Sequence, residues 1–124
     1  MRLIFLDYGG TLECLPDPVA FVYGLKAQGD MPILFTGSPL DVIQKAHPGL
    51  TEAVDHIVRK ASIHGDQYVE FAPEAKELVF VDNEPWYLSW VADIDQYDED
   101  RTWRVVPADQ AHTLLGRDFA HLED

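Results

Sequence analysis

The chain has 124 residues, enough for one domain with a real core and too few for two, so residues 1–124 are interpreted as a single domain. Hydrophobic residues make up 47% of the sequence, which excludes a disordered chain, and a formal net charge of -13 disfavours binding to nucleic acid or to anionic membranes. The single cysteine, Cys14, excludes an internal disulfide and a thiolate zinc cluster. With no secretion-signal pattern and only strand-length apolar runs, the sequence indicates a cytoplasmic protein without a membrane span.

Short apolar runs alternate with helical patterns along the chain. We expect strands at residues 2–7, 32–36, 56–58, 78–81 and 102–106, and helices at residues 19–28, 40–46, 86–92 and 108–115. A helical turn is expected at residues 51–55, a loop at 60–66 and an acidic, solvated connection at 93–101, whereas residues 67–75 fit either helix or loop. This alternation predicts an α/β fold, a three-layer sandwich around a mainly parallel, Rossmann-like sheet.

Three of the predicted strands end in a polar side chain: Asp7, Thr36 and Asp82. In a parallel sheet these ends lie along one edge, where open α/β sheets bind their ligands. Two glycines, Gly9 and Gly10, follow Asp7 at once and let backbone N–H groups approach an anion closely. The sequence therefore predicts a nucleophilic or metal-binding carboxylate beside a phosphate cradle.

These residues resemble the motifs of the haloacid dehalogenase (HAD)-like superfamily of phosphohydrolases. The stretch from Asp7 to Leu12 is similar to the first motif of that family, Thr36 to the second, Lys60 to the third, and the run from Phe80 to Pro85 to the fourth. The intervals agree with that order: 29 residues separate Asp7 from Thr36, 24 lead on to Lys60, and 22 more to Asp82. The resemblance covers about the first two thirds of the chain and implies a HAD-like sheet.

The resemblance also implies roles for individual residues. Asp7 would be the nucleophile that forms an aspartyl-phosphate, and Lys60 would neutralise the phosphoryl oxygens. The implied phosphate-binding residues are Gly10, Thr36, Gly37 and Lys60. The implied cofactor is Mg2+, and its implied ligands are Asp7, the backbone carbonyl of Gly9, Asp82 and Asn83.

Two positions depart from the family pattern. Active phosphatases of this family usually carry a second Asp two residues after the nucleophile, where this chain has Gly9, so no side chain there can move a proton. General acid–base help contributes roughly a hundredfold to ten-thousandfold in rate. Asn83 also stands where a second Asp is common. The candidates for a substitute proton carrier are Glu13, Tyr8, Glu84 and His64.

Short connections between the motifs leave no room for a cap domain. Only 24 residues span positions 12–35 and 23 span positions 37–59, so the resemblance implies a capless member with an open site. The resemblance implies that such an open site acts on a phosphorylated substrate, which can be a macromolecule. Alternatively, an oligomeric partner supplies the cap. Two functions stay open. One is a Mg2+-dependent phosphohydrolase of weak or narrow activity, and the other is a catalytically impaired domain that serves as a binding or regulatory module.

Overall fold

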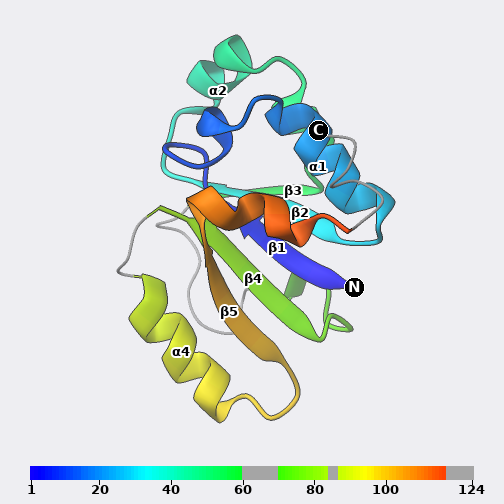
Figure 1. The fold of residues 1–124 in the computed structure, drawn as a ribbon, viewed down its shortest axis with the longest axis vertical. Helices are drawn as coiled ribbons and strands as arrows, with labels where there is room; N and C mark the ends of the chain where they lie inside the picture. Colours follow the sequence, from blue (N-terminus) through cyan, green and yellow to red (C-terminus); the bar gives the residue numbers. More distant parts are fainter. Residues whose placement is uncertain (60–69, 84–86, 117–124) are drawn as a thin grey trace.

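A computed structural model describes residues 1–59, 70–83 and 87–116. Its centre is a five-stranded sheet in which every neighbouring pair is parallel, with the order β3-β2-β1-β4-β5 (Figure 1). The strands are β1 (Arg2–Leu6), β2 (Met31–Thr36), β3 (His56–Arg59), β4 (Glu77–Asp82) and β5 (Thr102–Pro107). The predicted α/β fold with a parallel sheet is confirmed, and the described residues form no separate cap domain.

The connections carry helices close to the expected positions. They are α1 (Pro18–Ala27), α2 (Leu40–Ala46), α3 (Leu50–Ala53) and α4 (Tyr87–Tyr97), with 3-10 helices η1 (Leu12–Cys14) and η3 (Ala108–Leu114). The helix expected at residues 108–115 is present, as the tighter 3-10 helix η3. Within the described ranges, no helix combines the length and the apolar character needed to cross a bilayer.

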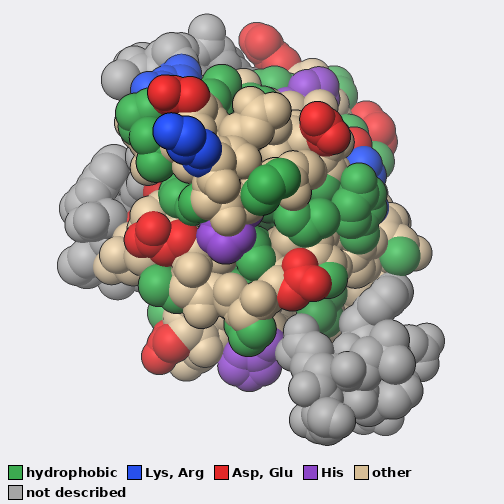
Figure 2. Space-filling view, turned by 90° about the horizontal axis from the view of Figure 1, so that it is seen from above, with side chains coloured by type: hydrophobic (Ala, Val, Ile, Leu, Met, Phe, Trp, Pro, Cys, Tyr) green, Lys and Arg blue, Asp and Glu red, His purple; other side chains and the backbone are tan. Residues whose placement is uncertain are grey.

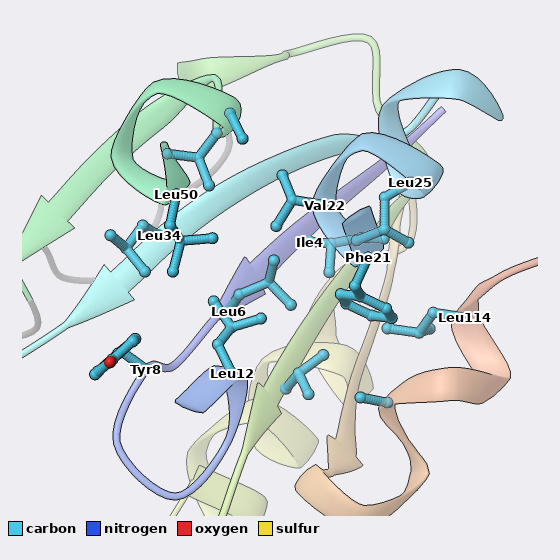
Figure 3. Close-up of a cluster of buried hydrophobic side chains, with 14 of the residues drawn as sticks. Ile4, Leu6, Tyr8, Leu12, Phe21, Val22, Leu25, Leu34, Leu50 and Leu114 are labelled. Atoms are coloured by element: carbon cyan, nitrogen blue, oxygen red, sulfur yellow. The ribbon is translucent and has the colours of Figure 1, made fainter. Parts of the chain in front are cut away.

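Two hydrophobic clusters cover the two faces of the sheet. On one face, Ile4 and Leu6 pack with residues from α1, α2, α3 and η3. Figure 3 shows those from α1, α3 and η3. On the other face, Leu3 and Phe5 pack with residues from α4, β5 and the segment 71–75. Side chains along a strand alternate between faces, so a strand buried on both faces is apolar on both, as β1 is from Leu3 to Leu6. The result is the expected three-layer sandwich.

The strand order reverses between β1 and β4, and the sheet edge at the carboxyl ends of these two strands is called the crevice below, after the place where such sheets bind ligands. From β1 the chain winds outward to β2 and β3, and it then returns to β4 on the other side of β1 before it reaches β5. The connections that follow β1 and β4 run in opposite directions along the sheet, so they move apart at the carboxyl ends of these strands. Ligands of such sheets bind at this point. β1 ends just before Asp7 and β4 ends at Asp82, so both carboxylates lie at this point.

The acidic segment at residues 93–101 is more ordered than the sequence suggested. We expected a solvated connection, but α4 continues to Tyr97, so the first half of the segment is helical. Oδ1 of Asp95 accepts a hydrogen bond from the Trp103 backbone N–H at 2.7 Å, and Oδ2 of Asp98 accepts one from the Trp103 indole at 2.7 Å. These carboxylates therefore attach α4 and its following turn to β5. Trp103 is buried, as expected for a packing residue.

Asp98 gives the fold a pH dependence whose sign can be worked out. Burial alone would raise the pKa of its carboxyl, but hydrogen bonds from the Trp103 indole and from the backbone of Asp100 and Arg101, with the Arg101 charge, lower it overall. A carboxyl whose pKa is lower in the folded state stabilises the fold above its unfolded pKa, and this contribution disappears as the pH falls through the folded pKa. We expect Asp98→Asn to be less stable than the wild type at neutral pH. The difference in urea denaturation should shrink once the pH falls below about 4, and a constant difference down to strong acid would contradict this account.

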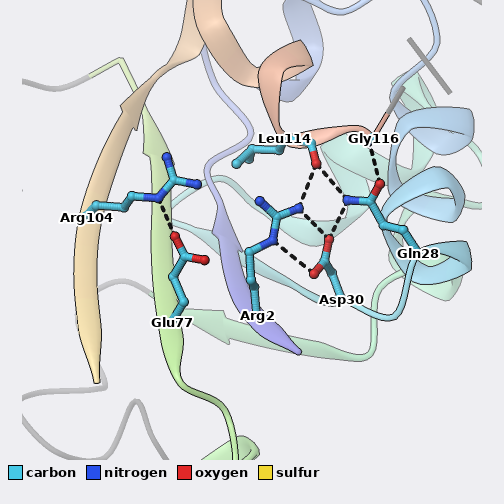
Figure 4. A network of polar contacts seen from close by, with 7 residues as sticks. All are labelled: Arg2, Gln28, Asp30, Glu77, Arg104, Leu114 and Gly116. Carbon is cyan, nitrogen blue, oxygen red and sulfur yellow. Dashed lines mark hydrogen bonds and ion pairs between the residues drawn. The ribbon is translucent and has the colours of Figure 1, made fainter. Parts of the chain in front are cut away.

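A polar network at the amino end of the sheet holds the last described residues in place (Figure 4). Nε and Nη2 of Arg2 donate to the two carboxylate oxygens of Asp30 at 3.0 and 2.7 Å, and Nη2 also donates to the Leu114 carbonyl at 2.7 Å. The Gln28 amide nitrogen donates to Oδ2 of Asp30 at 2.6 Å and to the Leu114 carbonyl at 2.7 Å, and the Gln28 amide oxygen accepts from the Gly116 N–H. The hydrogen bond to Asp30 raises the pKa of Arg2, against the effect of burial. The network thus fastens the end of η3 to β1 and to the turn before β2.

We expect Asp30→Asn to lower the free energy of unfolding by about 2–3 kcal/mol. The Asp30 side chain is only 6% exposed, and the substitution leaves a partly buried guanidinium without its counter-charge. Urea denaturation measures the change. Asp41→Asn is the matched control, because Asp41 is an exposed residue in the first turn of α2, and it should alter stability by less than about 0.5 kcal/mol. Equal stability of the Asp30 variant and the wild type would contradict this role.

Candidate functional site

Asp7 and Asp82 lie beside each other in the crevice between β1 and β4. The register pairs Leu6 with Val81, and the Asp7 N–H donates to the Val81 carbonyl at 3.0 Å, so the two aspartates follow aligned positions. Both are buried, with exposed fractions of 6% and 5%. The Thr11 hydroxyl contacts Oδ2 of Asp7 at 3.4 Å. Two carboxylates held this close at a sheet edge form an anionic centre that suits a cation.

Asn83 joins the two carboxylates. Its side-chain amide lies against both, and when its nitrogen is turned toward them it donates to Oδ2 of Asp7 at 3.2 Å and to Oδ1 of Asp82 at 3.1 Å. This orientation is assigned from the hydrogen-bond network, in which only the amide nitrogen can donate to carboxylate oxygens. Three residues of the expected metal set, Asp7, Asp82 and Asn83, therefore meet in one place.

Gly10 is required here because Asn83 occupies the space of its missing side chain. Its φ of 72° lies in the left-handed region, and an added Cβ would collide with the end of the Asn83 amide and lie 2.9 Å from its Cγ. Its N–H, expected at the phosphate, donates to Oε1 of Glu13 at 2.7 Å. Gly9 differs, since a Cβ there would meet only Oγ of Ser38, at an ordinary 3.9 Å. A side chain at position 9 therefore has room.

We expect Gly10→Ala to destabilise the protein by about 1–2 kcal/mol, since an L-residue is strained in the left-handed region. The new Cβ should also push the Asn83 amide away from the carboxylates. Chemical denaturation measures the first effect. Gly37→Ala is the matched control for stability, because Gly37 has no positive φ and an added Cβ there meets nothing within 4 Å. A Gly10 variant as stable as the control would show that the close approach to Asn83 is not needed.

Thr36 holds the loop that follows β2. Its side chain is fully buried, and its Oγ1 accepts a hydrogen bond from the Ser38 N–H at 3.0 Å. The hydroxyl hydrogen is therefore left to donate elsewhere. Arg59, at the end of β3, donates from Nη1 to the Ser38 carbonyl at 2.6 Å and from Nη2 to the Gly37 carbonyl at 3.4 Å. These bonds fix the loop after β2 near Gly9. Oγ of Ser38 in this loop lies 3.9 Å from where a Cβ on Gly9 would be.

Two features of this edge escaped the sequence reasoning. Arg59 directly precedes Lys60 and pairs in register with Thr36, so a cation at the strand end could have been found by extending β3 by one residue. Oγ of Ser38 lies 3.9 Å from where a Cβ on Gly9 would be, and this position depends on the packing of two loops, which a hydrophobic pattern does not show. Lys60, expected to neutralise phosphate, lies outside the described residues, as do Glu84 and His64.

The remaining candidates for proton transfer differ in their surroundings. Tyr8 is buried, and its ring packs edge-on against His47 with ring centroids 5.7 Å apart. Burial, together with the negative charge of Glu13, raises the pKa of Tyr8, so the phenol keeps its proton at neutral pH. Glu13 is exposed to solvent and reaches the glycine loop. Glu13 is thus the better placed of these two proton carriers.

Within the described residues, no cluster of three or more His, Cys, Asp or Glu side chains could hold a metal ion. A divalent cation in the crevice would therefore depend on the two aspartates together with amide or backbone oxygens, which hard cations such as Mg2+ accept. Asp7 and Asp82 would supply the carboxylates, and Asn83 would supply its amide oxygen if the amide turned away from its hydrogen-bonded orientation. The arrangement can bring a cation and an anionic ligand to the Asp7 carboxylate.

Comparisons with known proteins add little to this geometry. No family model matches the chain, and no curated protein matches it significantly. One solved structure, described as "Structure of MT0777", is similar with a TM-score of 0.43 and 16% sequence identity, and the match covers 86% of this chain and 84% of that chain. These values assign neither a family nor a function, so the functional conclusion depends on the residues of the crevice.

Proposed function

We propose that this protein is a HAD-like, Mg2+-dependent phosphohydrolase that acts through an aspartyl-phosphate on Asp7. The observation that carries the proposal is the meeting of Asp7, Asp82 and Asn83 at the carboxyl ends of β1 and β4. Buried carboxylates at this position of a doubly wound sheet are characteristic of a ligand site rather than of surface solvation. The order and spacing of the four sequence motifs agree with this assignment.

The three side chains would suit a magnesium ion once the Asn83 amide turns round. Its oxygen would then lie about 3 Å from one oxygen of each aspartate, at the positions that its nitrogen takes in the hydrogen-bonded orientation. Adjacent ligands of an octahedral Mg2+ with bonds of 2.0–2.1 Å are also about 3 Å apart. A bound cation would thus replace the two hydrogen bonds that the Asn83 amide donates to the carboxylates. This spacing supports the proposed cation site.

The surrounding residues would divide the work of phosphoryl transfer. The ion would supply charge neutralisation for the phosphoryl oxygens. The Asp7 carboxylate would attack phosphorus in line with the leaving oxygen, and the hydroxyl of Thr36 would donate to a phosphoryl oxygen. Arg59 would keep the loop of Gly37 and Ser38 in place through its two hydrogen bonds. A substrate can approach an edge that lacks a cap among the described residues.

The proposal is tested by cation binding and turnover measured together. Isothermal titration with Mg2+ should show one site in the wild type and at least a tenfold loss of affinity in Asp82→Asn, which removes one charge from the buried pair. The control is Asp41→Asn on α2, which should bind as the wild type does. Hydrolysis of p-nitrophenyl phosphate and acetyl phosphate should then require Mg2+. Absence of Mg2+ binding in the wild type would overturn the proposal.

A non-catalytic binding or regulatory module is the second candidate. Gly9 offers no side chain for proton transfer. The face in Figure 2 carries Asp and Glu side chains together with Lys, Arg, His and hydrophobic ones. The formal net charge of -13 favours a basic partner. Mg2+ binding with no turnover across a broad panel of phosphoesters would support this module over the enzyme.

A further inference from the structure

Phosphoester hydrolysis through an aspartyl-phosphate moves protons twice. The leaving oxygen must gain a proton when its bond to phosphorus breaks, and the attacking water must lose one in the second step. Asp7 and Asp82 cannot serve if they hold a cation and act as nucleophile, and Gly9 has no side chain. A further acid–base group near this loop is therefore needed for substrates whose leaving group is not already activated.

The glycine loop has a third carboxylate beside it. Oε1 of Glu13 accepts the Gly10 N–H at 2.7 Å. That nitrogen is two covalent bonds from the Cα of Gly9, so the oxygen lies no more than about 5.6 Å from this Cα. Glu13 therefore reaches the part of the loop from which a carboxylate on residue 9 itself would extend.

The surroundings of Glu13 suit a group that exchanges protons. Glu13 is exposed, so it can exchange protons with solvent after each turnover. It lies in η1, which is held to the Asp7 loop by bonds from the Glu13 N–H to the Tyr8 carbonyl at 3.1 Å and from the Leu12 N–H to the Asp7 carbonyl at 3.3 Å. Because these bonds are all local to residues 7–13, the carboxylate keeps its position relative to the proposed nucleophile.

We propose that Glu13 is the general acid and base of this site, an inference that rests on the proposed function. In the first step an Asp7 oxygen forms a bond to phosphorus, the ester P–O bond breaks, and its electron pair takes the proton of the Glu13 carboxylic acid. In the second step the Glu13 carboxylate takes a proton from water while the water oxygen bonds to phosphorus. The bond between phosphorus and Asp7 then breaks, which releases phosphate and the Asp7 carboxylate and leaves Glu13 protonated as at the start.

Alternatively, Glu13 has only a structural role, in which its carboxylate accepts the Gly10 N–H. An isosteric variant separates this structural role from a role in proton transfer. Glu13→Gln keeps an oxygen that accepts the Gly10 N–H but cannot transfer a proton. We expect it to fold with the stability of the wild type and to lose roughly tenfold or more in kcat for phenyl phosphate. For acetyl phosphate, whose leaving group needs no proton, the formation of the phosphorylated protein should change by less than about threefold. Glu52→Gln, an exposed residue on α3, is the control and should match the wild type.

The decisive comparison repeats Glu13→Gln in a Gly9→Asp background. Because an aspartate at position 9 can move the same protons, the loss caused by Glu13→Gln should fall to less than about threefold there. An equal loss in both backgrounds would show a structural role and overturn the inference. Wild-type turnover that survives Glu13→Gln, or turnover that appears only with Gly9→Asp, would overturn it while the proposed function stands. No turnover in any variant would reject the proposed function together with this inference.

Discussion

Asp7→Asn is expected to abolish turnover of p-nitrophenyl phosphate and acetyl phosphate, with a fall in kcat of at least about 10⁴-fold. Removal of a covalent nucleophile eliminates the intermediate itself, and losses of this size or larger follow in other covalent enzymes. The amide keeps the volume of the carboxylate and still accepts a hydrogen bond from the Thr11 hydroxyl, which contacts Oδ2. Steady-state kinetics with a saturating Mg2+ concentration measures the effect.

The control for this substitution is Asp55→Asn, a carboxylate on the surface beyond α3 that forms an ion pair with Lys26 at 3.6 Å. It removes the same charge away from the crevice and should leave kcat unchanged. Asp7→Asn should remain folded by circular dichroism, because the backbone bond from its N–H to the Val81 carbonyl is unaffected. Residual activity within tenfold of the wild type would show that Asp7 is not the nucleophile.

Gly9→Asp is expected to increase turnover. The position has ordinary backbone geometry, and a Cβ there lies 3.9 Å from Oγ of Ser38, so an aspartate can be accommodated without a shift of the loop. Its carboxylate would add a proton carrier next to the nucleophile, and such a group contributes up to roughly a hundredfold to ten-thousandfold. The gain should be largest for alkyl phosphates, whose leaving oxygen needs a proton most, and smallest for acetyl phosphate.

Gly9→Asn is the matched control, since it adds a side chain of the same size that cannot transfer a proton. It should leave the rate within about threefold of the wild type. Equal rates for both variants and the wild type would show that the missing carboxylate does not limit the reaction. An equal increase in both would trace the gain to packing rather than to acid–base chemistry.

The buried strands of this fold could be predicted because a strand buried on both faces has a continuous run of apolar residues in the sequence. β1, β2 and β4 are apolar on both faces, so each appears as a continuous run that stops at Asp7, Thr36 or Asp82. The three polar residues at the strand ends lie along one edge of the sheet because the strands are parallel. The pairing of Asp7 with Asp82 then depends only on β1 and β4 being neighbours, which the returning connection provides.

The contacts between loops could not be predicted in the same way. Gly10 appeared as a phosphate-binding glycine, but the side chain of Asn83 fills the space above it, a contact between segments more than seventy residues apart. The N–H of Gly10 is taken by Glu13, which sequence spacing alone could not establish. The extension of α4 through Tyr97 was also missed, because the hydrogen bonds that Asp95 and Asp98 accept from Trp103 could not be inferred from the sequence. Such details depend on register and side-chain direction, which a hydrophobic pattern does not encode.

The most direct test of the central claim is to trap the phosphorylated protein. Wild-type protein incubated with acetyl phosphate and Mg2+, quenched in acid and digested, should yield the peptide that contains Asp7 with the added mass of one phosphoryl group. The modification should be absent without Mg2+ and in Asp7→Asn. Phosphorylation at another residue, or no phosphorylation under conditions in which the substrate is hydrolysed, would contradict the assignment of Asp7 as the nucleophile.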